Sequence, residues 1–73
     1  MSLLRLQIEG RRLTTPELEV LRAAADGLSA RETGETLCKS EHTIATQRRA
    51  AQAKLGAKNL THAIALAYKR GIL

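Results

Sequence analysis

Two adjacent arginines among small polar side chains form the part of this sequence best suited to chemistry. They lie in the run SEHTIATQRRAAQAKLG, residues 40–56, which holds almost no bulky side chain. An arginine guanidinium presents N–H donors in a fixed plane and can bind a phosphate or a guanine edge through two parallel hydrogen bonds. Small neighbouring side chains let a helix backbone approach such a target closely. The run therefore predicts recognition of a polyanion.

The basic charge is concentrated in the second half of the chain. The 73 residues hold twelve Lys or Arg and seven Asp or Glu, which gives a net charge of +5. Residues 1–37 contain five of the basic and six of the acidic residues, net −1, whereas residues 38–73 contain seven and one, net +6. Such asymmetry favours nucleic acid as the partner, with an anionic membrane second. The simpler alternative is a solvated charged face without a ligand.

Other kinds of site find little support in the sequence. Cys38, His42 and His62 are the soft metal ligands, and their spacing matches no zinc pattern. We find no nucleophile–base pair, carboxylate pair or glycine-rich phosphate loop, so we expect no enzyme activity, cofactor or metal site. The lone cysteine excludes an internal disulfide, and no apolar run approaches the ~18 residues of a membrane span. We therefore expect a cytoplasmic protein with no membrane partner.

Local signals predict the helices that must position the arginines. Thr14 with Glu17, and Ser29 with Glu32, form two capping boxes that start a first and a second helix, the first ending at Gly27. A third helix is predicted to start after the N-cap Ser40 and to end at residue 55. A fourth is predicted over about residues 60–70. The last two residues are expected to fold back onto its apolar side. Two short helices joined by a tight turn, the second one basic, are typical of a helix-turn-helix.

The expected fold class is all-α, with four helices in one domain over residues 13–73. Residues 1–12 are expected to form a separate N-terminal arm or a short strand. The strand reading comes from the apolar residues Leu4, Leu6 and Ile8, which recur with period two.

A helical wheel separates residues 41–55 into two sides. Ile44, Ala51 and Leu55 fall within one narrow arc, which is predicted to face the core. The opposite side is small, polar and cationic, and it consists of His42, Ala45, Thr46, Arg49 and Ala53. This is the pattern that a helix entering the DNA major groove needs.

The wheel gives the two arginines separate expected roles. Arg49 points straight outward and can offer its fork to a guanine, whereas Arg48 lies nearer the core edge and is expected to send its head to a phosphate. The free N–H groups at the start of the third helix also suit a phosphate. The residues expected to contact the DNA backbone are Ser40, Thr43, Gln47, Arg48, Lys54 and Lys58. Those expected to read bases are His42, Ala45, Thr46 and Arg49.

From Leu13 to Leu73 the sequence resembles the GerE/LuxR-type helix-turn-helix domain of bacterial transcription regulators. The matching runs are LTTPELEVLRAAADGLSARETGETL, SEHTI, KLGAKN and HAIALAYKRGIL. The resemblance implies a DNA-binding domain whose third helix enters the major groove, with base reading by Ala45, Thr46 and Arg49. It also implies a bacterial, nucleoid-associated protein that dimerises through its fourth helix on a two-fold operator.

Several positions depart from the family pattern. Ala45 stands where Lys or Arg is usual, and Gln47 stands where His is common, so base readout is poorer in charge. Thr33 and Lys39 replace apolar core residues, which puts the packing of the second helix in question. Leu60 stands where Arg is common and is expected to be exposed. The expected dimer face consists of Leu60, Leu66 and Tyr68, and the alternative for Leu66 and Tyr68 is partial burial in the core.

The expected function is sequence-specific binding of double-stranded DNA by a transcription regulator. Further expected partners are a second copy of the chain and either RNA polymerase or a related regulator. The alternative is a protein-interaction adaptor or anti-activator that keeps the fold and pairs with a related regulator through the fourth helix. The missing charge at Ala45 and the expected exposure of Leu60 and Leu66 motivate it. A sigma-factor-like promoter module is a third reading, which the KLG and KRGIL runs disfavour. The length and the initial Met favour a small complete protein.

Overall fold

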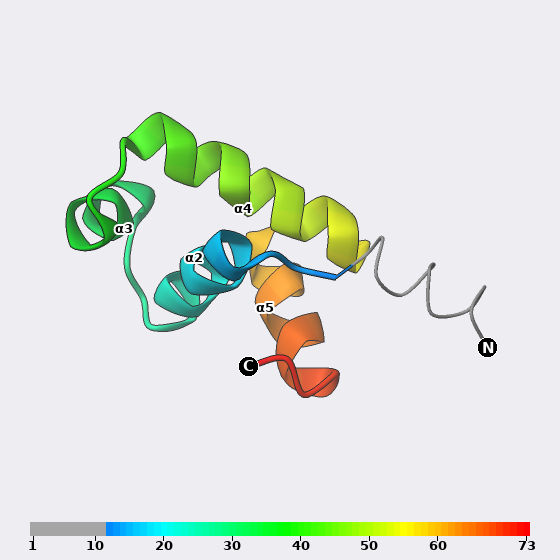
Figure 1. The fold of residues 1–73 in the computed structure, drawn as a ribbon. Coiled ribbons are helices and arrows are strands. Elements are labelled where there is room, and N and C mark those ends of the chain that lie inside the picture. The colour runs from blue at the N-terminus through cyan, green and yellow to red at the C-terminus, as the bar shows by residue number, and fades with distance from the viewer. Residues whose placement is uncertain (1–11) are drawn as a thin grey trace.

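The computed structural model describes residues 12–73, so the expected N-terminal arm or strand lies almost wholly outside the described residues. The all-α fold is confirmed, because the described part of the chain contains helices and no strand (Figure 1). Its four helices are α2 (Thr15–Ala25), α3 (Ala30–Leu37), α4 (Glu41–Leu55) and α5 (Leu60–Lys69).

The predicted helix starts are confirmed by their hydrogen bonds. The Thr14 N–H donates to Glu17 Oε1 at 2.9 Å, and the Glu17 N–H donates back to the Thr14 hydroxyl at 3.3 Å. Ser29 and Glu32 repeat the exchange at 2.9 and 3.0 Å. Each box satisfies two backbone donors that a helix start would otherwise leave free. These local bonds explain why α2 and α3 begin where the sequence predicts.

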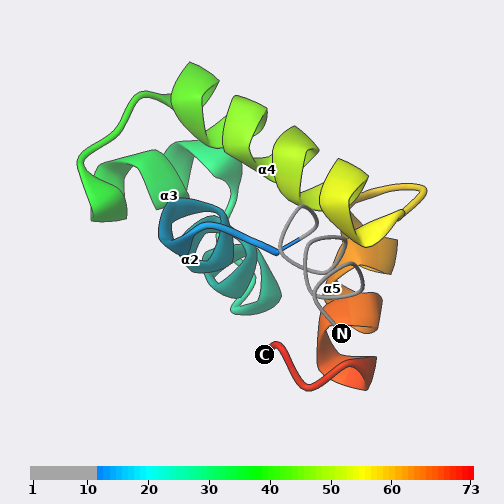
Figure 2. The same cartoon turned by 45° about the vertical axis from the view of Figure 1, so that its right-hand side comes forward.

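Helix α4 lies at the centre of the arrangement and contacts each of the other described helices. Figures 1 and 2 show α3 beneath its first turns and α5 beneath its last turns, with α2 between them. Helix α2 also contacts both α3 and α5. The two helices of the predicted helix-turn-helix, α3 and α4, therefore both pack against α2.

The hydrophobic core is small and entirely aliphatic. The predicted core side of α4 is confirmed, because Ile44 and Ala51 are fully buried and Leu55 is 4% exposed. The other buried hydrophobic residues are Val20, Leu21, Ala63 and Ala67. Partly buried hydrophobics pack around this cluster, and they are Leu13, Ala57, Leu60, Ile64, Leu66, Ile72 and Leu73.

Two expectations about the last helix have different outcomes. The fold-back of the C-terminus is confirmed, because the Ile72 and Leu73 N–H groups both donate to the Ala67 carbonyl, at 2.8 and 3.3 Å. The expected exposure of Leu60 is wrong, because this side chain is half-buried against the core cluster. Helices α4 and α5 contact each other, and Leu60 packs against the core cluster to which both contribute.

Two residues without an apolar side chain allow α3 to pack closely. Thr33 is fully buried, and its hydroxyl donates to the Ser29 carbonyl at 2.8 Å, so the polar group is satisfied inside its own helix. Gly34 lies against the following turn, where an added Cβ would sit 2.5 Å from the Lys39 carbonyl oxygen. The chain then reverses through Cys38, whose φ of 58° is left-handed. The turn between α3 and α4 thus depends on the missing Cβ of Gly34.

We expect Gly34→Ala to destabilise the domain. Alanine gains about 1 kcal/mol of helix propensity, but the clash is with a backbone carbonyl that cannot rotate away, and overpacking of this kind costs about 1–3 kcal/mol. Because the added Cβ would lie 2.5 Å from a backbone atom, we expect a cost near the upper end of this range and a net loss of about 2 kcal/mol in the free energy of unfolding, measured by urea denaturation. Thr36→Ala, exposed on the same helix, is the matched control and should stay within about 0.5 kcal/mol. A Gly34→Ala variant as stable as the wild type would contradict the close contact.

Candidate nucleic-acid interface

The outward side of α4 is left uncovered by residues 12–73. His42, Thr46, Arg49 and Ala53 are all exposed, and they follow one another at spacings of four, three and four residues along one side of the helix. Ala45 flanks them and is half-buried. We call these five residues the outer stripe. It is accessible along the whole length of the helix, as the wheel predicts.

The start of α4 is held by its own cap. The Thr43 N–H donates to the Ser40 hydroxyl oxygen at 3.0 Å, and that hydroxyl in turn donates to Thr43 Oγ1 at 2.9 Å. The Thr43 hydroxyl therefore keeps its own hydrogen free to donate. The sequence predicts that both Ser40 and Thr43 contact the DNA backbone. In the free domain the Ser40 hydroxyl is used in the helix cap, whereas the Thr43 hydroxyl can still donate a hydrogen bond.

The side chains at positions 47 and 48 turn toward the protein rather than outward. Arg48 Nη2 donates to the Leu28 carbonyl at 2.9 Å, and its Nε is buried without a hydrogen-bond partner among the described residues. Gln47 is half-buried, with its Oε1 in the same unpartnered state. The expectation that the Arg48 head is free to reach a phosphate therefore does not match the structure. The head bonds instead to the loop between α2 and α3.

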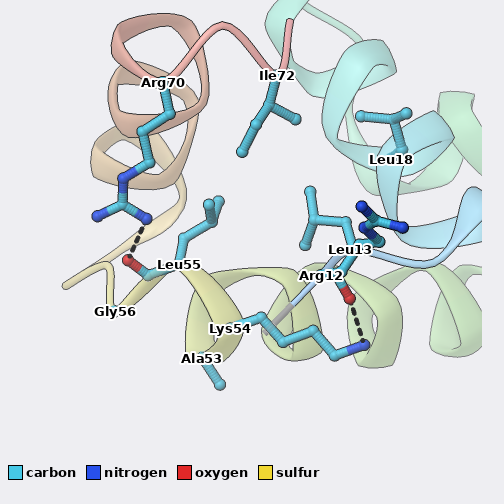
Figure 3. A pocket seen from close by; sticks show the side chains of 9 residues that line it. All are labelled: Arg12, Leu13, Leu18, Ala53, Lys54, Leu55, Gly56, Arg70 and Ile72. Atoms are coloured by element: carbon cyan, nitrogen blue, oxygen red, sulfur yellow. Dashed lines mark hydrogen bonds between the residues drawn. The ribbon is translucent and has the colours of Figure 1, made fainter. Parts of the chain in front are cut away.

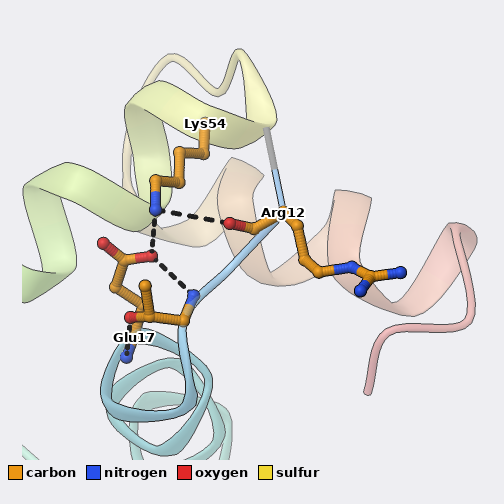
Figure 4. A network of polar contacts seen from close by, with 4 residues as sticks. Arg12, Glu17 and Lys54 are labelled. Carbon is orange, nitrogen blue, oxygen red and sulfur yellow. Dashed lines mark hydrogen bonds and ion pairs between the residues drawn. The ribbon is translucent and has the colours of Figure 1, made fainter. Parts of the chain in front are cut away.

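Lys54 also makes its polar contacts within the domain (Figure 4). Its Nζ lies 2.8 Å from Glu17 Oε1 and 3.3 Å from the Arg12 carbonyl oxygen. The two paired side chains are only 28% and 11% exposed, which shields the ion pair from solvent. The same Glu17 oxygen accepts the capping N–H of Thr14, so Lys54 ties the end of α4 to the start of α2. A phosphate contact by Lys54 would have to compete with this pair.

The environment of Glu17 changes its ionisation. Burial raises its pKa, but the hydrogen bond from Lys54, the Thr14 N–H and the nearby ammonium charge together outweigh burial and lower the pKa below the ordinary 4.5. The pKa of Glu32 is lowered as well, by its hydrogen bonds from the Ser29 backbone and side chain. The two capping carboxylates therefore favour the folded state most in their charged form.

A groove of about 810 Å³ opens where three distant segments meet (Figure 3). Its apolar lining comes from the start of α2, the end of α4 and the C-terminal tail, and three basic residues complete the wall. One of these, Arg70, donates Nη1 to the Leu55 carbonyl at 3.2 Å and so caps the end of α4. The lining residues are Arg12, Leu13, Leu18, Ala53, Lys54, Leu55, Gly56, Arg70 and Ile72. Sequence reasoning did not predict this groove, because no local pattern joins residues so far apart.

The loop before α5 presents one free-standing cation. Lys58 is exposed, while its N–H donates to His62 Nδ1 at 3.0 Å. The His62 N–H donates to Asn59 Oδ1 at 2.8 Å, and His62 lies in the first turn of α5. The loop is thus fixed by local bonds, and the Lys58 ammonium remains available at the surface.

The expected dimer face is only partly exposed. Tyr68 is 58% exposed, but Leu60 and Leu66 are half-buried against the core, which corrects the expected exposure of Leu60 and matches the partial burial that was the alternative for Leu66. The exposed residues of α5 are Thr61, Ala65, Tyr68 and Lys69. Any surface that α5 offers to a partner is therefore built mainly from small and polar side chains around one tyrosine.

Within residues 12–73, no group of three or more His, Cys, Asp or Glu side chains is placed to hold a metal ion. None of the helices described is both long and apolar enough to cross a bilayer.

The geometry defines the class of the domain. Helices α3 and α4 are joined by a tight turn, and α4 keeps a cationic side uncovered, which is the arrangement of a helix-turn-helix DNA-binding domain. Residues 11–67 match the model of a family described as bacterial regulatory proteins, luxR family. The chain belongs to this family, and the resemblance seen in the sequence is confirmed.

A curated relative shares much of the domain sequence. Over 62 residues the chain is 45% identical to Transcriptional activator protein BjaR1 of Bradyrhizobium diazoefficiens. The match covers 85% of this chain and 26% of that protein. The chain thus spans about a quarter of the length of its relative, and the similarity concerns the helix-turn-helix domain.

Glu17→Gln is expected to weaken the domain in a pH-dependent way. The amide keeps a capping acceptor but loses the charge-assisted bond to Lys54, so we expect a loss of about 1–2 kcal/mol in the free energy of unfolding near pH 7. Because the folded pKa lies below the ordinary 4.5, the wild type holds this stability above that pH and loses it as the pH falls through the folded value. The difference between the two proteins should therefore narrow toward about pH 3, measured by urea denaturation across the range.

Glu19→Gln provides the control, since Glu19 is exposed on the same helix. We expect it to change stability by no more than about 0.5 kcal/mol at either end of the pH range. A Glu17→Gln difference that stays constant down to acid would show that the charge on this carboxylate does not stabilise the fold.

Proposed function

We propose that this chain is the DNA-binding part of a transcription regulator, which places α4 in the major groove of double-stranded DNA. The observation that carries the proposal is the outer stripe, which is exposed and cationic on a helix whose opposite side is buried in the core. The fifteen residues of α4, at ~1.5 Å of rise each, give ~22 Å, ample for a groove ~12 Å wide. The name of its relative, a transcriptional activator, supports a role in transcription.

The proposed contacts divide between bases and backbone. Arg49 reads a guanine through its free fork, while Thr46 and Ala45 allow close approach and contact base edges or thymine methyl groups. His42 extends the stripe toward the start of the helix. Phosphate contacts come from Lys58, from the hydroxyl of Thr43 and from the free N–H groups of the first turn of α4.

We further propose that two copies bind together on a two-fold operator. The exposed side of α5 offers Thr61, Ala65 and Tyr68 on successive turns, where small residues permit close packing around the tyrosine ring. A regulator of this kind acts in the bacterial cytoplasm on the nucleoid, with RNA polymerase or a related regulator as a further partner. The adaptor alternative was motivated by the uncharged Ala45 and by exposure of Leu60 and Leu66. Both leucines lie against the core, which leaves Ala45 as its only support, so we do not adopt it.

The dependence of binding on salt tests the DNA role. If one domain neutralises about three to five phosphates, log affinity should fall against log salt with a slope of about −3 to −5. The measurement is fluorescence anisotropy with a duplex selected from a random pool and a scrambled duplex of equal length. A flat salt response, or no binding at low salt, would contradict the proposal.

Arg49→Ala tests the base contact separately. We expect the affinity for the selected duplex to fall about tenfold, with much less change for the scrambled one, because a bidentate contact is worth about 1–3 kcal/mol of discrimination. Lys69→Ala removes an exposed cation at the end of α5 and is the control, for which we expect the discrimination to be unchanged. Equal loss on both duplexes in Arg49→Ala would assign this residue to the backbone.

Tyr68→Glu tests the proposed dimer. Two like charges facing each other across the two-fold axis should abolish pairing, so binding to a duplex with two half-sites should weaken at least about tenfold, to the level of a single half-site. Affinity for an isolated half-site should be unchanged, which serves as the internal control. Wild-type protein that binds paired half-sites independently, measured by stoichiometry and titration, would contradict the dimer.

A further inference from the structure

Arg48 and Arg49 are neighbours in sequence but face different parts of the molecule. Arg49 is exposed on the outer stripe, whereas Arg48 is half-buried with its Nη2 on the Leu28 carbonyl. The head of Arg48 is therefore engaged before any DNA arrives. We propose that Arg48 is a positioning residue, which fixes the orientation of α4 and so aims the outer stripe at the bases. This inference rests on the proposed DNA-binding function.

The carbonyl that accepts from Arg48 belongs to Leu28, a residue in the short connection between α2 and α3 that is held at both ends. The Leu28 N–H donates to the Ala23 carbonyl at 3.1 Å, which ties Leu28 to the last turn of α2. The next residue, Ser29, is the N-cap of α3. By accepting from Arg48 at 2.9 Å, this single residue links the end of α2, the start of α3 and the middle of α4.

The apolar side chains that α4 buries are few and small, so they do little to fix the orientation of the helix, and a directional hydrogen bond can supply this. Between Ile44 and Leu55 the buried side of the helix carries only Ala51, a residue with little shape to resist sliding or tilting. A hydrogen bond from a guanidinium is stronger than a neutral one and restricts both distance and direction. Arg48 lies between Thr46 and Arg49, so a tilt at this point would displace the base-reading side chains directly.

A phosphate contact is the competing role for Arg48. To make one with its full fork, the side chain would have to give up the Leu28 bond and withdraw its Nε, which is buried. A third role is purely structural, in which the bond adds stability without affecting DNA recognition. The three roles predict different combinations of salt dependence, discrimination and stability.

Arg48→Met separates these roles, because methionine keeps an apolar stem but removes the charge and the donors. A positioning role predicts that discrimination between the selected and scrambled duplexes falls about tenfold, since misaligned base contacts cost about as much as missing ones. The salt slope should stay within about 0.3 of the wild type, because no phosphate contact is lost. Both are measured at a temperature where circular dichroism shows the variant to be folded.

The other outcomes would overturn the proposal. Equal weakening on both duplexes, with a slope less negative by about 0.9, would assign Arg48 to a phosphate. Lower stability with unchanged discrimination would leave it a structural residue only. Arg49→Met is the matched variant, and it should lose discrimination without losing stability, because its head is exposed in the free protein.

A measurement without DNA tests the bond itself and separates its failure from failure of the proposed function. In nitrogen-15 spectra of the free wild-type protein, the guanidinium N–H signals of Arg48 should exchange with water at least about tenfold more slowly than those of Arg49. Adding the selected duplex should shift the Arg49 signals and leave those of Arg48 in place. Rapid exchange at Arg48 in the free protein, or a large shift of its signals on adding DNA, would overturn the inference. A wild type that binds no duplex but keeps a protected Arg48 would count against the DNA role alone.

Discussion

The structure depends on one constraint: α4 has to be the centre of the core on one side and an open surface on the other. It contacts each of the other described helices, yet only Ile44, Ala51 and Leu55 along its fifteen residues are buried. A helix that was apolar all round would close the domain and leave nothing to face a ligand. The narrow buried arc is thus what permits the outer stripe, because the rest of the domain packs on that arc and its flanks and leaves the opposite side open.

A narrow contact has a physical cost, because it buries little surface. Alanine at three of the seven buried hydrophobic positions lets the helices approach closely, but it contributes little area to hold them. Hydrogen bonds from basic side chains to distant segments, which we call polar tethers, add further contacts between the helices. Arg48 bonds to the loop after α2, Lys54 to the start of α2, and Arg70 to the end of α4. Each tether joins a cation to a backbone carbonyl or a carboxylate, so it fixes direction as well as distance.

What the sequence predicts and what it misses follow from the range of the interactions. The capping boxes, the helix ends and the buried arc of α4 arise from residues within a few positions of each other, and their patterns are readable in the chain. The partners of Arg48 and Lys54 lie 20 and 37 residues away, and no local pattern distinguishes these cations from Arg49. For the same reason Leu60 was expected at the surface, although it packs against the core cluster and is only partly exposed. The left-handed Cys38 was also unpredicted, since glycine is the usual residue in that conformation.

The inward tethers change how the charge of the chain should be interpreted. Residues 38–73 carry seven Lys or Arg, but Arg48, Lys54 and Arg70 each donate to a group within the domain. The charge that α4 offers to a duplex is then largely that of Arg49, since Ala45 contributes none. Few contacts per domain give weak binding by a single copy, and modest affinities combine to high affinity only when two sites engage together. Under the proposed function, the same interactions that hold α4 in place leave recognition to a second copy and to the accurate placement of one arginine.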